Sequence, residues 1–124
     1  MNSLDGLLQF NQTALTLHAE RQKLIASNIA NADTPGYKAR DIDFVSALKD
    51  AQSAQSKLHA APALNALSTD DKVMYRSAVQ RSADGNTVDI DVERAQFAEN
   101  AVRYEAQTQF ITYQIKQMMA ALQG

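Results

Sequence analysis

The sequence has no cysteine and no tryptophan, and among its 124 residues only eight are aromatic and two are proline. Without cysteine the chain can form neither disulfides nor thiolate metal and nucleophile sites. Because aromatics are few and 21 residues are alanine, the side chains that bury the most area are scarce. We therefore expect a thin hydrophobic core and a helical chain, since alanine is the best helix former.

Charge of neither sign dominates: 12 basic and 14 acidic residues give a formal net charge of −2 and are spread along the chain. No cluster of lysine and arginine is present to meet a phosphate backbone, so we exclude nucleic-acid binding. The first ten residues contain no basic segment, and their longest apolar run is Leu7 and Leu8. We therefore expect neither a cleaved signal peptide nor a transmembrane span.

Groups that carry catalytic chemistry are few. Neither histidine has a metal-ligand spacing to a second histidine or to clustered carboxylates, so we expect packing or surface roles for both. Two alternating carboxylate pairs lack a surrounding sequence that would build a cleft, and the four glycines form no phosphate loop. We therefore predict no enzyme, no cofactor, no metal site and no small-molecule substrate. The residues considered are His18, His59, Asp41, Asp43, Asp89 and Asp91.

An apolar period with three- and four-residue steps and no proline runs through the first quarter of the chain. It predicts one amphipathic helix, which occupies residues 1–32. Asn11, His18 and Arg21 interrupt the apolar stripe near its centre, so we expect looser packing there than at the helix ends. The residues expected to pack are Leu4, Leu7, Leu8, Leu24, Ile25 and Ile29.

A second apolar period lies at the end of the chain, in alternating steps of four and three that are typical of a coiled-coil seam. The acidic residues Asp89, Asp91 and Glu93 suit the positive end of a helix dipole, so we place the helix start near Asp91. This helix occupies residues 91–124. Its seam residues are Phe97, Ala101, Tyr104, Thr108, Ile111, Ile115, Met118 and Leu122.

Both helices are much longer than the usual globular helix of about 11 to 12 residues. We expect them to run almost to the chain ends, where terminal backbone groups need water or a neighbouring subunit. The predicted fold class is mainly α, with the two helices pairing as an antiparallel coiled coil around an irregular or extended middle segment. In that pairing the packing residues of the first helix face Tyr104, Ile111, Ile115, Met118 and Leu122. This pattern favours a structural assembly subunit.

The middle segment, residues 46–90, is predicted to be flexible or extended, because it has too few large apolar residues to offset its ordering entropy. A helix is locally plausible over residues 44–58. Residues 73–88 suit a short extended piece or a hairpin with a turn at residues 84–86.

A dense group of turn formers follows the first helix, in residues 33–45. Pro35 fixes φ near −65° and Gly36 supplies the positive φ that a type II turn requires, which leaves Tyr37 as an anchor beyond the turn. Asp41 and Asp43 then flank Ile42, which predicts an extended segment with one buried face.

The run SNIANADTPGY at residues 27–37 resembles the N-terminal signature shared by the axial proteins of the bacterial flagellum, the rod and hook subunits. Its continuation, KARDIDF, and the run DGNTVD at residues 84–89 are similar to the proximal rod proteins of type B in that family. The chain is too short for the large inserted domain of the distal rod and hook subunits, and type C rod proteins carry extra residues in the turn. The assembly motif implied by this resemblance consists of Asn28, Ile29, Ala30, Asn31, Thr34, Pro35, Gly36 and Tyr37.

The resemblance implies a structural subunit of the proximal rod of the flagellar basal body, assembled helically as part of the drive shaft and the export channel wall. The implied partners are copies of the chain, other rod subunits, the ring–rod junction protein and the membrane ring. It also implies export through the flagellar type III apparatus without a cleaved signal peptide, and a periplasmic location in the rod. The alternative is a helical adaptor or export chaperone of a type III secretion system, which would stop at a defined small complex instead of forming open assemblies.

Overall fold

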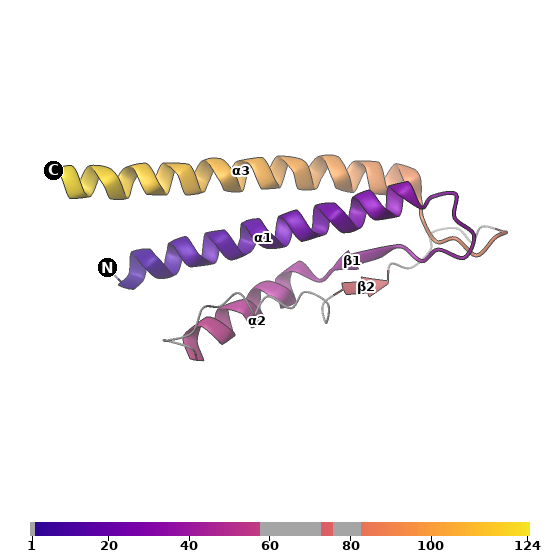
Figure 1. The fold of residues 1–124 in the computed structure, drawn as a ribbon, viewed down its shortest axis with the longest axis horizontal. Helices are drawn as coiled ribbons and strands as arrows, with labels where there is room; N and C mark the ends of the chain where they lie inside the picture. Colours follow the sequence, from indigo (N-terminus) through magenta and orange to yellow (C-terminus); the bar gives the residue numbers. More distant parts are fainter. Residues whose placement is uncertain (1, 58–72, 76–82) are drawn as a thin grey trace.

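The computed structural model describes residues 2–57, 73–75 and 83–124 (Figure 1). Its elements are α1 (Asn2–Ala30), β1 (Arg40–Ile42), α2 (Phe44–Lys57), β2 (Val73–Tyr75) and α3 (Ile90–Gln123). The long helices α1 and α3 lie side by side and antiparallel, so both chain ends are at the same end of the molecule (Figure 1). This arrangement confirms the predicted fold class of two long terminal helices around a less regular middle.

Helix α3 begins where the acidic residues predicted it. The N-cap residue Asp89 has an extended backbone, and its carboxylate accepts hydrogen bonds from the backbone nitrogens of Asp91 and Val92 at 3.1 and 3.3 Å. These bonds satisfy two of the donors that a helix start leaves unpaired. Asp91 and Glu93 then lie in the first turn, near the positive end of the helix dipole.

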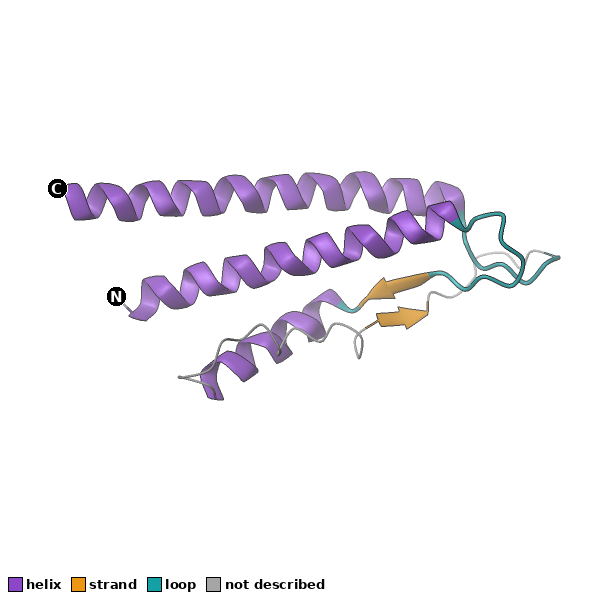
Figure 2. Cartoon of the chain, viewed as in Figure 1, coloured by secondary structure: helices purple, strands orange, loops and turns teal. Residues whose placement is uncertain are grey.

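The face of α1 that points away from α3 packs against a small apolar core. Leu17 packs with Ile42 and Ala47, and Leu24 and Phe44 are packed against this cluster. Helix α1 therefore lies between α3 on one side and β1 and α2 on the other (Figure 2). The core is thin, as expected from the shortage of large apolar side chains.

The predicted helix in residues 44–58 is present as α2, and Asp43 caps it by accepting from the Ser46 nitrogen at 3.3 Å. Ile42 is buried, whereas Asp41 is half-buried and Asp43 is exposed, which confirms the extended segment with one buried face. The extended piece at residues 73–75 pairs antiparallel with β1, not within a hairpin of its own. Residues 76–82 of that predicted hairpin, and residues 58–72 of the predicted flexible segment with His59, lie outside the described residues.

Among the helices that the structure describes, none combines the length and the apolar content needed to cross a membrane.

Candidate functional site

The face of α3 that meets α1 contains a column of polar residues spaced seven apart: Glu93, Asn100, Gln107 and Gln114. Glu93 and Asn100 are buried, and Gln107 and Gln114 are half-buried on an otherwise exposed helix. A seven-residue spacing keeps side chains on one face of a helix that packs along a partner. We call these four residues the polar column.

At the open end of the helix pair, Asn11 of α1 bonds to two members of the polar column. Its Nδ2 donates to Gln114 Oε1 at 2.7 Å, and its Oδ1 accepts from Gln107 Nε2 at 2.9 Å. Asn11 therefore links two positions of α3 that lie about two helical turns apart, which fixes the register of the two helices.

The next contact towards the turn is between His18 and Asn100. The Asn100 Nδ2 donates to the His18 carbonyl oxygen at 2.8 Å and to Gln22 Oε1 at 2.7 Å, so its Oδ1 is the acceptor for His18 Nδ1 at 3.1 Å. The imidazole also stacks on Phe44, with ring centroids 4.4 Å apart. Burial lowers the pKa of His18, the nearby Arg103 and Arg21 lower it further, and the bond to Asn100 opposes them.

Arg21 connects three elements. Its Nε and Nη2 donate to the two carboxylate oxygens of Asp41 in β1 at 3.0 and 3.2 Å, and Nη2 also donates to Gln96 Oε1 in α3 at 2.7 Å. A bidentate guanidinium–carboxylate pair fixes both partners in orientation. Asp41 therefore has a structural role in holding β1 against α1.

At the other end of α1, the fully buried Asn28 uses all of its side-chain bonding capacity. Its Nδ2 donates to the Arg40 carbonyl at 2.7 Å and to Glu93 Oε2 at 3.1 Å. Its Oδ1 accepts from the Arg40 nitrogen at 3.0 Å and from the Tyr37 hydroxyl at 3.2 Å. One amide thus joins α1, the segment after the turn, and the start of α3.

The turn after α1 has the geometry that the sequence predicted. Gly36 has a φ of 74°, and the Tyr37 nitrogen donates to the Thr34 carbonyl at 3.2 Å, as in a type II turn. Tyr37 acts as the predicted anchor, because its hydroxyl bonds to Asn28 and lies 3.1 Å from Ser27 Oγ.

The segment just before α3, residues 84–87, forms hydrogen bonds to this turn. The buried Asn86 donates through Nδ2 to the carbonyls of Asn31, Ala32 and Thr34 at 2.9, 3.0 and 2.7 Å. The Gly36 nitrogen donates to the Asp84 carbonyl at 2.9 Å. We call the hydrogen bonds that Asn86 and Asp84 form with residues 31–36 the turn clamp. It lies at the end of the molecule where the loops gather (Figure 2).

The expectation that the polar interruption makes the centre of α1 looser than the helix ends is wrong for the N-terminal end. Asn11 is 5% exposed, whereas Leu4 near the helix end is 47% exposed. The interrupting residues bond across the helix pair, and within the described residues no buried side-chain nitrogen or oxygen lacks a partner. The centre of α1 is therefore packed more closely than its N-terminal end, because polar groups whose hydrogen bonds are satisfied can be buried.

The predicted helix-packing residues lie in different surroundings. Ile25 is fully buried, and Leu24 packs against the core on the α2 side of α1 instead of meeting α3. Four others are half-buried: Leu8, Ile29, Ile111 and Met118. The remaining six are exposed in the single chain: Leu4, Leu7, Phe97, Tyr104, Ile115 and Leu122. A role of these exposed residues in contacts between subunits stays a prediction.

The polar column is what the apolar pattern missed. The predicted seam residues Phe97, Tyr104, Ile111 and Met118 border α1. In the other half of the predicted seam, Ala101, Thr108 and Ile115 each come one residue after a member of the polar column. The signal that could have found it is the seven-residue spacing of Glu93, Asn100, Gln107 and Gln114, matched by Asn11 and His18 in α1.

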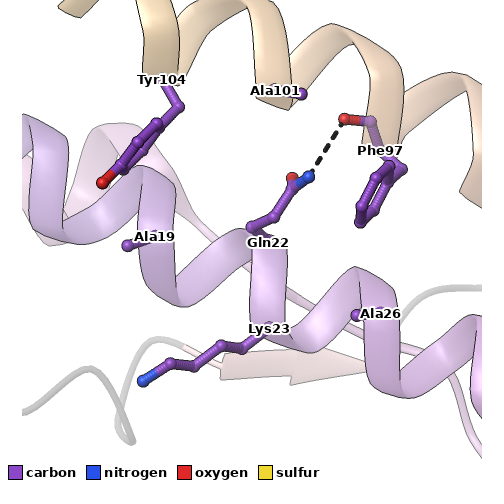
Figure 3. Close-up of a pocket in the computed structure, with 7 residues that line it drawn as sticks. All are labelled: Ala19, Gln22, Lys23, Ala26, Phe97, Ala101 and Tyr104. Carbon is purple, nitrogen blue, oxygen red and sulfur yellow. Dashed lines mark hydrogen bonds between the residues drawn. The ribbon is translucent and has the colours of Figure 1, made fainter. Parts of the chain in front are cut away.

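A groove runs along one side of the helix pair, with a volume of about 460 Å³. Its lining residues are Ala19, Gln22, Lys23, Ala26, Phe97, Ala101 and Tyr104. Figure 3 shows the two aromatic rings reaching from α3 towards α1 with Gln22 between them. In the part of the chain that the structure describes, no group of three or more histidine and carboxylate side chains could hold a metal ion.

The sequence is similar to that of known proteins. Residues 8–38, which hold most of α1 and the turn, match the family model described as flagella basal body rod protein. The chain is 45% identical to the flagellar basal body rod protein FlgB of Escherichia coli K12, with all of this chain and 98% of that protein aligned. It is 44% identical to FlgB of Salmonella typhimurium and 39% identical to FlgB of Aeromonas hydrophila, over 98% and 96% of those proteins. The chain therefore belongs to the FlgB family of flagellar basal body rod proteins.

Proposed function

We propose that this chain is a structural subunit of the proximal rod of the flagellar basal body, and that it packs helically with copies of itself and with other rod subunits. Membership in a family of structural rod proteins, not enzymes, supports this function. The observation that carries the mode of assembly is the exposure of apolar side chains along α3: Ile115 is 42% and Leu122 is 80% exposed. Such side chains gain roughly 25 cal/mol for each Å² that a neighbour covers.

Because the polar column contacts α1, the two long helices pair within one chain while the apolar residues Ile115 and Leu122 stay exposed. Hydrogen bonds from Asn11, His18 and Asn28 fix the register of α1 and α3 within one chain. Buried polar contacts of this kind specify register more than they add stability. The apolar residues of α3 then remain available to bind between subunits.

The turn clamp gives the helix pair a fixed end. Asn28 is buried, and Asn31 and Tyr37 are half-buried; all three form side-chain hydrogen bonds within the chain. Thr34 and Pro35 are exposed, although Thr34 also bonds to Asn31. We infer that the buried members of the assembly motif shape the turn and that the exposed members contact adjacent subunits. The motif then has two roles in assembly: its buried members order the turn, and its exposed members contact the neighbouring subunit.

We propose finer assignments as well, because the resemblance to the rod family implies them. The rod lies in the periplasm, the chain reaches it through the flagellar type III export apparatus without a cleaved signal peptide, and its neighbours include the ring–rod junction protein and the membrane ring. A thin core suits export, since little packing must be undone before the chain is threaded.

Electron microscopy of basal bodies isolated from cells that carry a tagged copy tests the proposal. We expect the tag on the membrane-proximal part of the rod, and we expect no rod when the gene is deleted. The matched control is the same tag on a soluble cytoplasmic protein, which should not copurify. A tagged chain that is absent from complete basal bodies and forms only a small complex with one partner would establish the adaptor or chaperone function instead.

A further inference from the structure

The groove between α1 and α3 has a shape suited to protruding side chains. Its small members are Ala19 and Ala26 of α1, seven residues apart, and Ala101 of α3. Phe97 and Tyr104, also seven residues apart, form its walls. Alanines between aromatic walls leave holes of the kind into which large side chains of another helix insert.

A second apolar surface lies elsewhere on α3. Val102, Phe110 and Tyr113 are 68%, 50% and 60% exposed. With Ala106 they follow three- and four-residue steps, so they share one face of the helix. At 3.6 residues per turn, this face points about 100° to 180° away from Ala101. We call these four residues the ridge.

We propose that the groove of one copy receives the ridge of a second copy of this chain. This inference rests on the proposed function, and it names the surfaces through which that assembly proceeds. The groove presents small residues and the ridge presents an aliphatic and two aromatic side chains, so each supplies what the other lacks. Because groove and ridge lie on different sides of α3, a copy bound through its ridge still has its own groove free. Such a heterologous contact adds further copies instead of closing as a dimer.

Charge favours the same pairing. Of the seven groove-lining residues only Lys23 is charged, and its side chain is largely exposed. Glu105 borders the ridge by helical position, beside Val102 and Ala106, whereas the Glu99 carboxylate is paired with Arg103 at 2.8 Å. Lys23 pairs with Glu20 at 3.1 Å on the surface of α1, and a ridge seated in the groove adds the Glu105 carboxylate to the surroundings of this ammonium, which favours the contact.

Because the natural chain has no cysteine, introduced cysteines report contacts without background. We would express Ala101→Cys (groove) and Ala106→Cys (ridge) together in cells that lack the natural chain, isolate basal bodies, and treat them with a short flexible bis-maleimide. We expect a dimer that contains one copy of each variant. A single chain with both cysteines should give a ladder of dimers, trimers and larger products. Lys49→Cys, on the exposed side of α2, should give no dimer with either variant.

A further variant tests the aromatic part of the contact. Tyr113→Ala, combined with Ala106→Cys, should lower the yield of mixed dimer by roughly tenfold, as expected for an aromatic residue that fills a pocket. Its matched control is Tyr75→Ala, an exposed tyrosine on β2, which should leave the yield unchanged.

Three outcomes would overturn the pairing. Dimers formed by Ala101→Cys alone would show a symmetric groove-to-groove contact. A cross-link from Ala101→Cys to a different rod protein would show another occupant. Variants that are present in basal bodies but give no mixed dimer would show that the two surfaces do not meet. In each case the variants are still found in the rod, so the proposed function would stand, whereas absence of the tagged natural chain from basal bodies would overturn that function itself.

Discussion

Asn100 and His18 hold each other through two hydrogen bonds across the helix pair. The asparagine amide donates to the histidine backbone carbonyl at 2.8 Å, and the imidazole Nδ1 donates to the asparagine Oδ1 at 3.1 Å. The two residues are 82 positions apart in the sequence. This reciprocal contact fixes the position of α3 along α1, since a shift of either helix by one turn would break both bonds.

Replacing Asn100 with alanine should destabilise the helix pair. The His18 carbonyl and the Gln22 side chain would lose their shared donor in a buried site, at a cost of about 1 to 3 kcal/mol. Urea unfolding of the purified chain, followed by circular dichroism, measures the loss. Gln109→Ala on the exposed face of α3 is the control, and it should change the unfolding free energy by less than about 0.5 kcal/mol. Equal stability of the two variants would contradict the structural importance of the Asn100 contact.

Stability should also fall as the pH is lowered through the ordinary pKa of histidine. Burial, together with Arg103 and Arg21, holds the pKa of His18 below the value of 6.5 that it has when unfolded. Between the two values the unfolded chain binds more protons, so folding weakens as pH falls through 6.5, and the loss levels off below the folded pKa. Unfolding free energies at about pH 7.5 and about pH 5.5 should show this decrease.

The matched variants for the pH effect carry His59→Gln, which removes the only other imidazole in the chain. In that background, additional His18→Gln should remove most of the pH dependence in this range. If the His59→Gln chain and the double variant have the same pH dependence, His18 is not the titrating group.

The positive φ of Gly36 predicts a graded effect of substitution. No atom lies within 4 Å of where a Cβ would be, so the cost comes from the backbone alone, about 1 to 2 kcal/mol for most residues. Gly36→Val should therefore impair the turn and reduce rod assembly, whereas Gly36→Asn should be milder because asparagine tolerates positive φ. Motility in soft agar and the yield of basal bodies measure the difference. Full motility of the valine strain would contradict the importance of this turn.

Gly36 also shows which features local sequence can predict. The type II turn, the start of α3 at Asp89 and the end of α1 depend on residues a few positions apart, whose backbone preferences are intrinsic. Two long apolar periods likewise predicted both terminal helices. These features needed no knowledge of the rest of the fold.

Long-range polar contacts could not be predicted in the same way. Asn86 bonds to carbonyls 52 to 55 positions earlier, and nothing around it in the sequence distinguishes it from an ordinary turn asparagine. The polar column was missed because polar residues at heptad spacing look like a solvated face until the partner helix is known. The pairing of β1 with β2 was missed for the same reason, since three-residue strands carry little pattern.

Hydrogen exchange of the purified chain should show graded protection along α1. Residues 11–28 contact α3 through buried hydrogen bonds, whereas residues 4–7 are exposed, as are most residues of α3 from 115 onwards. We therefore expect slow exchange in the centre of α1 and fast exchange at the open end of the pair, because exchange tracks local opening. Uniformly strong protection of both helices in a dilute monomer would show that the ends are stable without a neighbouring subunit.

The last prediction separates export from assembly by changing Ile115, which is exposed on α3 next to the half-buried Ile111. Ile115→Asp should leave the single chain folded, since the carboxylate can stay in water until a neighbour covers it. On assembly the same carboxylate would be buried without a partner, at a cost of several kcal/mol. Export should tolerate the change, because an unfolded chain in the export channel presents no folded surface. We therefore expect normal amounts of the protein in the periplasm, no rod and no motility, measured by fractionation, electron microscopy and swimming assays.

Adding Ile111→Asp should also weaken the α1 contact and lower the stability of the secreted chain. Val45→Asp, the same kind of change at an exposed position of α2, is the control and should leave rods and motility intact. Normal rods with Ile115→Asp would remove this face from the assembly surface, and retention of that variant in the cytoplasm would show that α3 serves export as well.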